Sequence, residues 1–144
     1  MFKHILVPTD GSELSQKAVD GAVALAKSLG ASITAYVCTE SYPYMPVSEF
    51  VVETPLSFKE RVDAQAEAAL LGVQQAAKSA GVACDSDRTE HAVPYMGIIE
   101  AAQRHGCDLI LMASHGRRGL SGVLLGSETQ KVLTHTTIPV LVFR

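Results

Sequence analysis

Glycine residues cluster late in the chain, in a pattern that suits phosphate binding. Four of the 11 glycines fall between positions 116 and 126, directly before the segment Ser127–Gln130. That segment, Ser-Glu-Thr-Gln, has the spacing of a capping box and predicts the start of a helix. Glycines let a backbone approach a ligand closely, and the free amides of a helix N-terminus favour an anion. The cluster therefore predicts a phosphate site, with a flexible surface loop as the alternative.

A second segment that can carry chemistry, Pro8–Ser12, follows the apolar run at the start of the chain. Its sequence, Pro-Thr-Asp-Gly-Ser, predicts a turn after a buried strand and supplies one acid, Asp10. Neither a second carboxylate nor a lysine completes an evident catalytic constellation with it. We therefore assign no catalytic residue.

The sequence lacks the signatures of several enzyme and receptor classes. The phosphate-binding pattern G-x-x-x-x-G-K-[ST] does not occur, and no G-x-G-x-x-G follows the first apolar run. A phospho-signalling receiver is disfavoured because the third strand ends in Glu90–His91 and no lysine follows the last strand. His4 and His91 have no partners at metal-ligand spacing, so no metal site is predicted.

Strand and helix patterns alternate along the chain. Short apolar or β-rich runs predict strands, and apolar residues at helical spacing predict helices. The expected strands are 2–8, 31–38, 82–91, 109–112 and 138–143, and the expected helices are 12–29, 57–80, 94–105 and 127–135. The stretch 39–57 lacks clear periodicity and is expected to be a lid or a mobile segment.

This alternation predicts one domain, residues 1–144, of the α/β class. The expected architecture is an open, doubly wound, five-stranded parallel sheet with helices on both faces. The continuous apolar runs 2–8 and 109–112 are expected at its centre, and the polar run 82–91 at an edge. The strand order 3-2-1-4-5 satisfies both conditions. It places a ligand crevice at the C-terminal ends of the first and fourth strands, between the two segments described above.

The last strand, 138–143, is left at the other edge of this sheet. Its sequence, Ile-Pro-Val-Leu-Val-Phe, is strongly apolar, and exposed apolar edges invite pairing with another chain. We therefore predict a homodimer joined through this strand.

Composition narrows the expected partners and location. A net charge of −3 makes nucleic acid an unlikely main partner, because such binding depends on neutralising phosphates. No apolar run reaches the roughly 20 residues that a membrane span needs. The first residues lack the pattern of a secretory leader, and the three cysteines are too few and too scattered for a disulfide framework. A cytoplasmic location is expected.

Over almost its whole length the chain resembles the universal stress protein family. The resemblance rests on Val7–Ser12, Met112–Leu120, Leu124–Ser127 and Pro139–Val142. The nucleotide-binding branch of that family carries Gly-x2-Gly-x9-Gly-[Ser/Thr]. Here Gly116 is followed by nine residues and then by Gly126 and Ser127, while Ala113 occupies the first glycine position. We expect the alanine to reduce nucleotide affinity modestly.

The resemblance implies an adenine nucleotide as ligand: ATP, with AMP and ADP as alternatives and Mg²⁺ as a companion ion. It implies the following contacts: Asp10 with Pro8 and Thr9 on the ribose and adenine side, Val37 against adenine, Met112 and Ala113 along the pocket, and Gly116, Gly126, Ser127 and Thr129 at the phosphates. Two further candidates are His115, in the loop, and Glu128, in the first turn of the last helix.

The function implied is that of a dimeric ATP-binding module of the stress response, which acts on an unidentified protein partner. Two alternatives stay open. One is a slow ATPase, and the other is a family member that binds no nucleotide and works through protein contacts alone.

Overall fold

The structure is a computed structural model that describes residues 1–43, 53–116 and 125–144. Its elements, in chain order, are β1 (His4–Pro8), α1 (Glu13–Leu29), β2 (Ser32–Thr39), α2 (Pro55–Ala80), β3 (Cys84–Glu90), α3 (Pro94–Arg104), β4 (Leu109–Ala113), α4 (Ser127–His135) and β5 (Val140–Phe143). Residues 44–52 of the expected lid, and the glycines at positions 119 and 122, lie outside the described residues.

The strands form one parallel sheet in the order β3-β2-β1-β4-β5. In the centre of this sheet, Ile5 of β1 lies opposite Ile33 of β2 on one side and Leu109 of β4 on the other. The predicted fold class and strand order are thereby confirmed.

Burial follows position in the sheet. All five residues of β4 are buried, and so are Ile5–Val7 in the middle of β1. The edge strand β3, Cys-Asp-Ser-Asp-Arg-Thr-Glu, contains no buried residue. Strands covered by helices on both faces need continuous apolar sequence, which explains why apolarity predicted the order.

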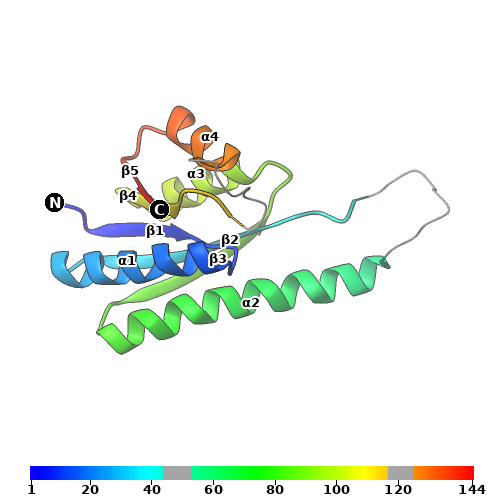
Figure 1. The fold of residues 1–144 in the computed structure, drawn as a ribbon, viewed down its shortest axis with the longest axis horizontal. Helices are drawn as coiled ribbons and strands as arrows, with labels where there is room; N and C mark the ends of the chain where they lie inside the picture. Colours follow the sequence, from blue (N-terminus) through cyan, green and yellow to red (C-terminus); the bar gives the residue numbers. More distant parts are fainter. Residues whose placement is uncertain (44–52, 117–124) are drawn as a thin grey trace.

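Helices cover both faces of the sheet (Figure 1). α1 and α2 pack together on one face, and α3 and α4 pack together on the other. Successive side chains of a strand point to opposite faces of the sheet, so the core is divided between the two helix layers. Ile5 and Val7 join the cluster under α1 and α2, and Leu6 joins the cluster under α3 and α4. The two layers hold the C-terminal ends of the strands at one edge of the molecule.

The start of α2 differs from the prediction. The helix begins at Pro55 and not at Ser57, because Thr54 takes the cap position and its hydroxyl accepts a hydrogen bond from the Ser57 amide. Proline suits the first helical position, where its missing N–H costs nothing. The Ser57–Glu60 spacing that predicted a cap lies inside the first turns of the helix.

The start of β5 also differs from the prediction. The strand begins at Val140 and not at Ile138. Pro139 has no N–H for the ladder, although its carbonyl accepts a hydrogen bond from the Ile110 amide at 2.9 Å. The ladder with β4 therefore starts directly after the proline.

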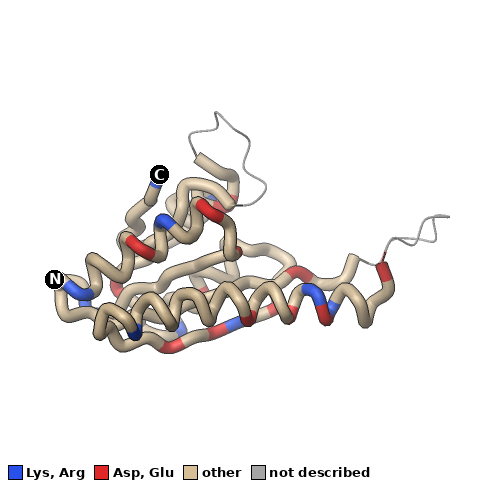
Figure 2. The backbone as a smooth tube through the Cα atoms, turned by 60° about the horizontal axis from the view of Figure 1, so that its bottom comes forward, with Lys and Arg blue, Asp and Glu red and all other residues tan. Residues whose placement is uncertain are grey.

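Charged residues of both signs lie along α2, most of them in its N-terminal half (Figure 2). Asp63 illustrates the arrangement: it contacts Lys59 one turn earlier at 2.6 Å and Arg88 of β3 at 3.3 Å. The Asp63–Arg88 ion pair connects α2 to the polar edge strand. Among the described residues, no helix is both long and apolar enough to cross a membrane.

Candidate functional site

The turn after β1 holds Asp10 in a fixed position. The Asp10 carboxylate accepts a hydrogen bond from the Ser12 amide at 2.9 Å, which closes a turn around Gly11. Gly11 has φ +76°, a backbone conformation that glycine adopts without strain. Thr9 anchors the turn from the other side, because its amide donates to the Tyr36 carbonyl of β2 at 2.9 Å.

The end of β4 is joined directly to the start of α4. The Gly126 amide donates to the Ser114 carbonyl at 2.6 Å, and the Thr129 hydroxyl donates to the Ala113 carbonyl at 3.0 Å. Ser114 and Thr129 are both buried. These bonds fix the first turn of α4 against the C-terminal end of β4.

Gly116 brings the β4 end against the β1 turn. A Cβ atom at Gly116 would collide with the Asp10 carboxylate, so this carboxylate lies directly over the glycine backbone. Any side chain at position 116 would push the carboxylate out of the position that Ser12 gives it.

Gly126 is packed less tightly than Gly116, and mainly against backbone. A Cβ atom there would lie 3.1 Å from both the Ser114 carbonyl oxygen and the His115 Cα. A larger residue would force α4 away from β4. The structure thus brings together Asp10, Gly116, His115 and Gly126, four of the residues implied by the family resemblance.

The N-terminus of α4 differs from those of the other helices. Ser12 caps α1, Thr54 caps α2, and side chains from outside the helix bind the first amides of α3. The N-cap residue of α4 is Gly126, which has no side chain, and within the described residues no side chain caps the helix. Among the residues that the structure describes, the amides of its first turn therefore have no side-chain acceptor. Ser127, at the first position of the helix, is exposed.

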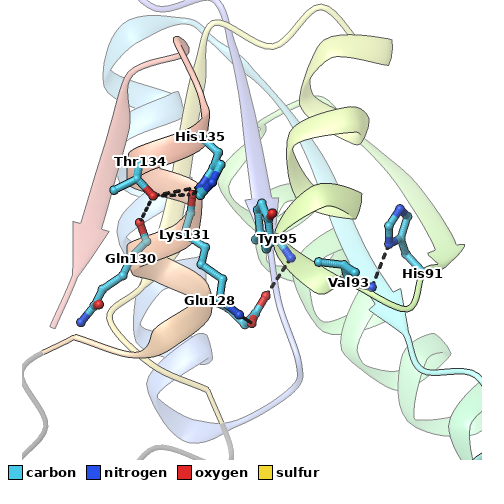
Figure 3. A network of polar contacts seen from close by, with 8 residues as sticks. All are labelled: His91, Val93, Tyr95, Glu128, Gln130, Lys131, Thr134 and His135. Atoms are coloured by element: carbon cyan, nitrogen blue, oxygen red, sulfur yellow. Dashed lines mark hydrogen bonds and ion pairs between the residues drawn. The ribbon is translucent and has the colours of Figure 1, made fainter.

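Glu128 points toward α3. One carboxylate oxygen accepts a hydrogen bond from the Tyr95 amide at 2.8 Å, and the other contacts the Lys131 ammonium at 3.1 Å (Figure 3). The structure therefore places this predicted site residue in the contact between α3 and α4.

Three further predicted residues are buried at the strand ends. Val37, Met112 and Ala113 have exposed fractions of 6%, 7% and 8%. The Ala113 side chain belongs to the α1–α2 core cluster, and Met112 belongs to the α3–α4 cluster. Pro8 lies beside them, opposite Tyr36 of β2.

Ser15 and Ser114 organise the site although sequence reasoning did not select them. Ser15 is buried, and its hydroxyl lies 2.6 Å from the Thr9 hydroxyl and 3.3 Å from the Asp10 amide. The Ser114 hydroxyl lies 3.2 Å from the ring nitrogen Nδ1 of His115. A serine on the buried face of α1, close to the predicted cap, was the signal available for Ser15.

Cys38, at the end of β2, is held in its neutral form. Burial raises the pKa of the Cys38 thiol, and its Sγ lies 3.8 Å from the His91 carbonyl oxygen. Burial likewise raises the pKa of the neighbouring Tyr36 hydroxyl. Both side chains are consequently uncharged at neutral pH. The described ranges contain no group of three or more His, Cys, Asp or Glu side chains that could hold a metal ion.

Solved structures share this fold closely. Universal stress protein MJ0577 of Methanocaldococcus jannaschii superposes with a TM-score of 0.82 at 25% identity, covering 99% of this chain and 96% of its own. Universal stress protein UspA of Lactobacillus plantarum gives a TM-score of 0.78 at 27% identity, with coverage of 99% and 97%.

More distant structures of the same fold contain nucleotides. A universal stress protein in complex with cAMP has a TM-score of 0.72 at 23% identity, covering 99% of this chain and 97% of its own. One from Archaeoglobus fulgidus with dAMP has a TM-score of 0.70 at 16% identity, with coverage of 99% and 98%. One from Arabidopsis thaliana with AMP has a TM-score of 0.69 at 16% identity, with coverage of 98% and 90%.

Sequence comparison gives the family. Universal stress protein MJ0531 of Methanocaldococcus jannaschii is 31% identical over all of this chain and 83% of its own length. Universal stress protein YxiE of Bacillus subtilis is 32% identical over the full length of both proteins. Residues 1–144 match the Universal stress protein family. The chain therefore belongs to the universal stress protein family.

Proposed function

We propose that this protein binds an adenine nucleotide, ATP in the first instance, at the C-terminal ends of β1, β2 and β4. The observation that carries the proposal is the start of α4, where no side chain within the described residues caps the helix and Gly126 is packed against β4. Amides at the positive end of a helix dipole form a seat for phosphate. Relatives of the same fold with AMP, dAMP or cAMP support the choice of an adenine nucleotide.

The surrounding residues fit the rest of such a ligand. The Asp10 carboxylate, fixed by the Ser12 amide, is an acceptor suited to ribose hydroxyls. Val37, beside the β1 end, offers an apolar surface for the adenine base. The exposed Ser127 hydroxyl and the first-turn amides of α4 would hold the phosphates, and Mg²⁺ would offset part of their charge.

Ala113 is compatible with this arrangement. Its methyl group packs in the α1–α2 core cluster. The alanine at the first glycine position therefore adds its bulk to the core, which argues for retained nucleotide binding and a small effect on affinity.

The protein acts in this proposal as a binding module and not primarily as a catalyst. The bound nucleotide would alter the contacts of a dimeric cytoplasmic protein with a partner in the stress response. The buried, neutral groups at the end of β2, Cys38 and Tyr36, offer no general base for hydrolysis.

The test is to denature the purified protein, identify any released nucleotide, and titrate the emptied protein with Mg-ATP by calorimetry. We expect a released adenine nucleotide and a saturable binding signal. Gly126→Val and Asp10→Ala should each lower ATP affinity at least about tenfold, a loss of about 1.4 kcal/mol.

Gly72→Ala is the matched control for the glycine variant. An added Cβ at this position of α2 meets no atom within 4 Å, so the substitution should leave ATP affinity unchanged. No released nucleotide together with no calorimetric signal would refute the proposal. If the parent binds but both site variants bind equally well, the nucleotide lies elsewhere on the protein.

A further inference from the structure

α3 begins with amide groups that are bound by side chains from outside the helix. The His91 ring nitrogen Nδ1 accepts from the Val93 amide at 2.9 Å, and Glu128 accepts from the Tyr95 amide at 2.8 Å. Between them, Pro94 has no amide hydrogen to satisfy. Glu128 thus occupies, from α4, the place that a capping side chain of α3 itself would take.

Glu128 is also the second residue of α4. Its carboxylate therefore lies near the positive ends of two helices, its own and α3, and it contacts the Lys131 ammonium at 3.1 Å (Figure 3). These three positive partners hold the side chain in one direction. That direction is toward the first turn of α3.

The contacts of the first turn of α4 divide into two sets. Gly126 and Thr129 attach it to the end of β4, through Ser114 and Ala113. Glu128 attaches it to the first turn of α3. Two further α3–α4 contacts lie further along α4: the Lys131 ammonium is 5.6 Å from the Tyr95 ring centre, and the His135 ring is 4.9 Å from it.

We propose that Glu128 is a positioning residue for the nucleotide. Its bond to the Tyr95 amide clamps the first turn of α4 to α3, so that the amides of that turn face the phosphates in a fixed orientation. The same bond directs its negative charge toward the first turn of α3. This inference rests on the proposed nucleotide site, and it assigns to Glu128 an orienting role without contact to the ligand.

The opposing possibility is that Glu128 repels the phosphates. Two variants separate the possibilities. Glu128→Gln keeps an oxygen that accepts from Tyr95 but removes the charge, whereas Glu128→Ala removes both. Binding is measured by calorimetry with ATP and with AMP, since repulsion acts more strongly on the more highly charged ligand.

If Glu128 positions α4, Glu128→Gln binds both ligands within about twofold of the parent. Glu128→Ala binds both about fivefold more weakly, the effect expected for a lost hydrogen bond of ordinary strength. Tighter binding by both variants, with the larger gain for ATP, would overturn the proposal. Parent-like binding by Glu128→Ala would overturn it too.

Hydrogen exchange of the Tyr95 amide tests the clamp without any nucleotide. This amide should exchange slowly in the parent and in Glu128→Gln, and at least about tenfold faster in Glu128→Ala. Lys131→Gln is the control, because it removes the ion pair and leaves the bond to Tyr95 in place. Equal exchange in all four proteins would show that the clamp is absent. If the four proteins show the expected exchange rates but the parent binds no nucleotide, the function proposed for the site is refuted and the clamp is not.

Discussion

At the scale of single residues, Gly116 matters through the space that it leaves for a neighbour. The Asp10 carboxylate occupies the position where a side chain at residue 116 would begin, and Ser12 holds it there. The backbone of Gly116 has no positive φ, so its conformation alone does not demand glycine. The two residues should therefore act as one unit in nucleotide binding.

A double-mutant cycle measures this dependence. Gly116→Ala should weaken ATP binding about tenfold, because the added methyl group displaces the carboxylate. In an Asp10→Ala background the same change should cost less than about twofold, since the group that it displaces is already gone. Calorimetric titration of the four proteins gives the coupling. Equal losses in both backgrounds would mean that Gly116 serves the ligand directly.

Sequence reasoning reaches some of these residues and not others. The family pattern predicted that Gly116 and Gly126 bracket nine residues directly before a helix, and the structure places both glycines in close contacts at the ends of β1 and β4. The direction of Glu128 was not predictable, because it depends on how α3 and α4 pack side by side. The Ser114 carbonyl accepts the Gly126 amide only because the start of α4 lies against the end of β4, and this packing was not predictable either.

At the scale of elements, the loop before β4 is tied to the start of β1 by one carboxylate. Asp108 accepts hydrogen bonds from the amides of Lys3 and His4 at 2.9–3.1 Å. Burial alone would raise the pKa of Asp108, but these two amides outweigh it and hold the pKa below its ordinary value. The charged carboxylate therefore stabilises the folded protein.

The sign of this effect sets a pH dependence. A carboxyl group whose pKa is lowered by folding stabilises the protein above its unfolded-state pKa of about 3.9, and this stabilisation disappears as pH falls through the folded-state value. At pH near 7, Asp108→Asn should lower the free energy of unfolding by about 1 kcal/mol. The difference in free energy of unfolding between Asp108→Asn and the parent should disappear as the pH falls from about 5 to about 2.

Urea unfolding across this pH range is the measurement. Asp85→Asn, on the exposed edge strand, is the control and should leave the free energy of unfolding nearly unchanged at each pH. A gap between Asp108→Asn and the parent that does not vary with pH would contradict the assignment of the effect to the charge.

The order of the strands in the sheet was predictable for a physical reason, whereas the boundaries of helices and strands were harder to predict. Apolarity ranked the strands because parallel strands at the centre are covered on both sides, as β4 is. The start of α2 was misplaced because two cap signals overlap in Thr54–Glu60. Thr54 prevails, with Pro55 next to it at the first helical position.

At the scale of the whole molecule, the two edges of the sheet differ. β3 is polar and forms an ion pair with α2 through Arg88 and Asp63, whereas β5 carries Val-Leu-Val-Phe with Leu141 exposed. The carbonyls of Pro139 and Phe143 accept bonds from β4. Because successive residues of a strand direct their backbone groups to opposite sides, the amides of Val140 and Val142 face the open edge. We propose that a second copy of the chain pairs there.

The backbone of Val142 allows this homodimer to be tested without disturbing the bonds to β4. Val142→Pro removes an outward-facing amide, a change that edge strands tolerate, whereas Val142→Thr keeps the amide and the branched side chain. Light scattering should give twice the 15.3 kDa of one chain for the parent and for Val142→Thr, and the mass of a single chain for Val142→Pro. Circular dichroism should show the same fold in all three, because the core strands β1 and β4 are untouched. A parent that stays monomeric at high protein concentration would refute the dimer, and a dimeric Val142→Pro would move the interface away from β5.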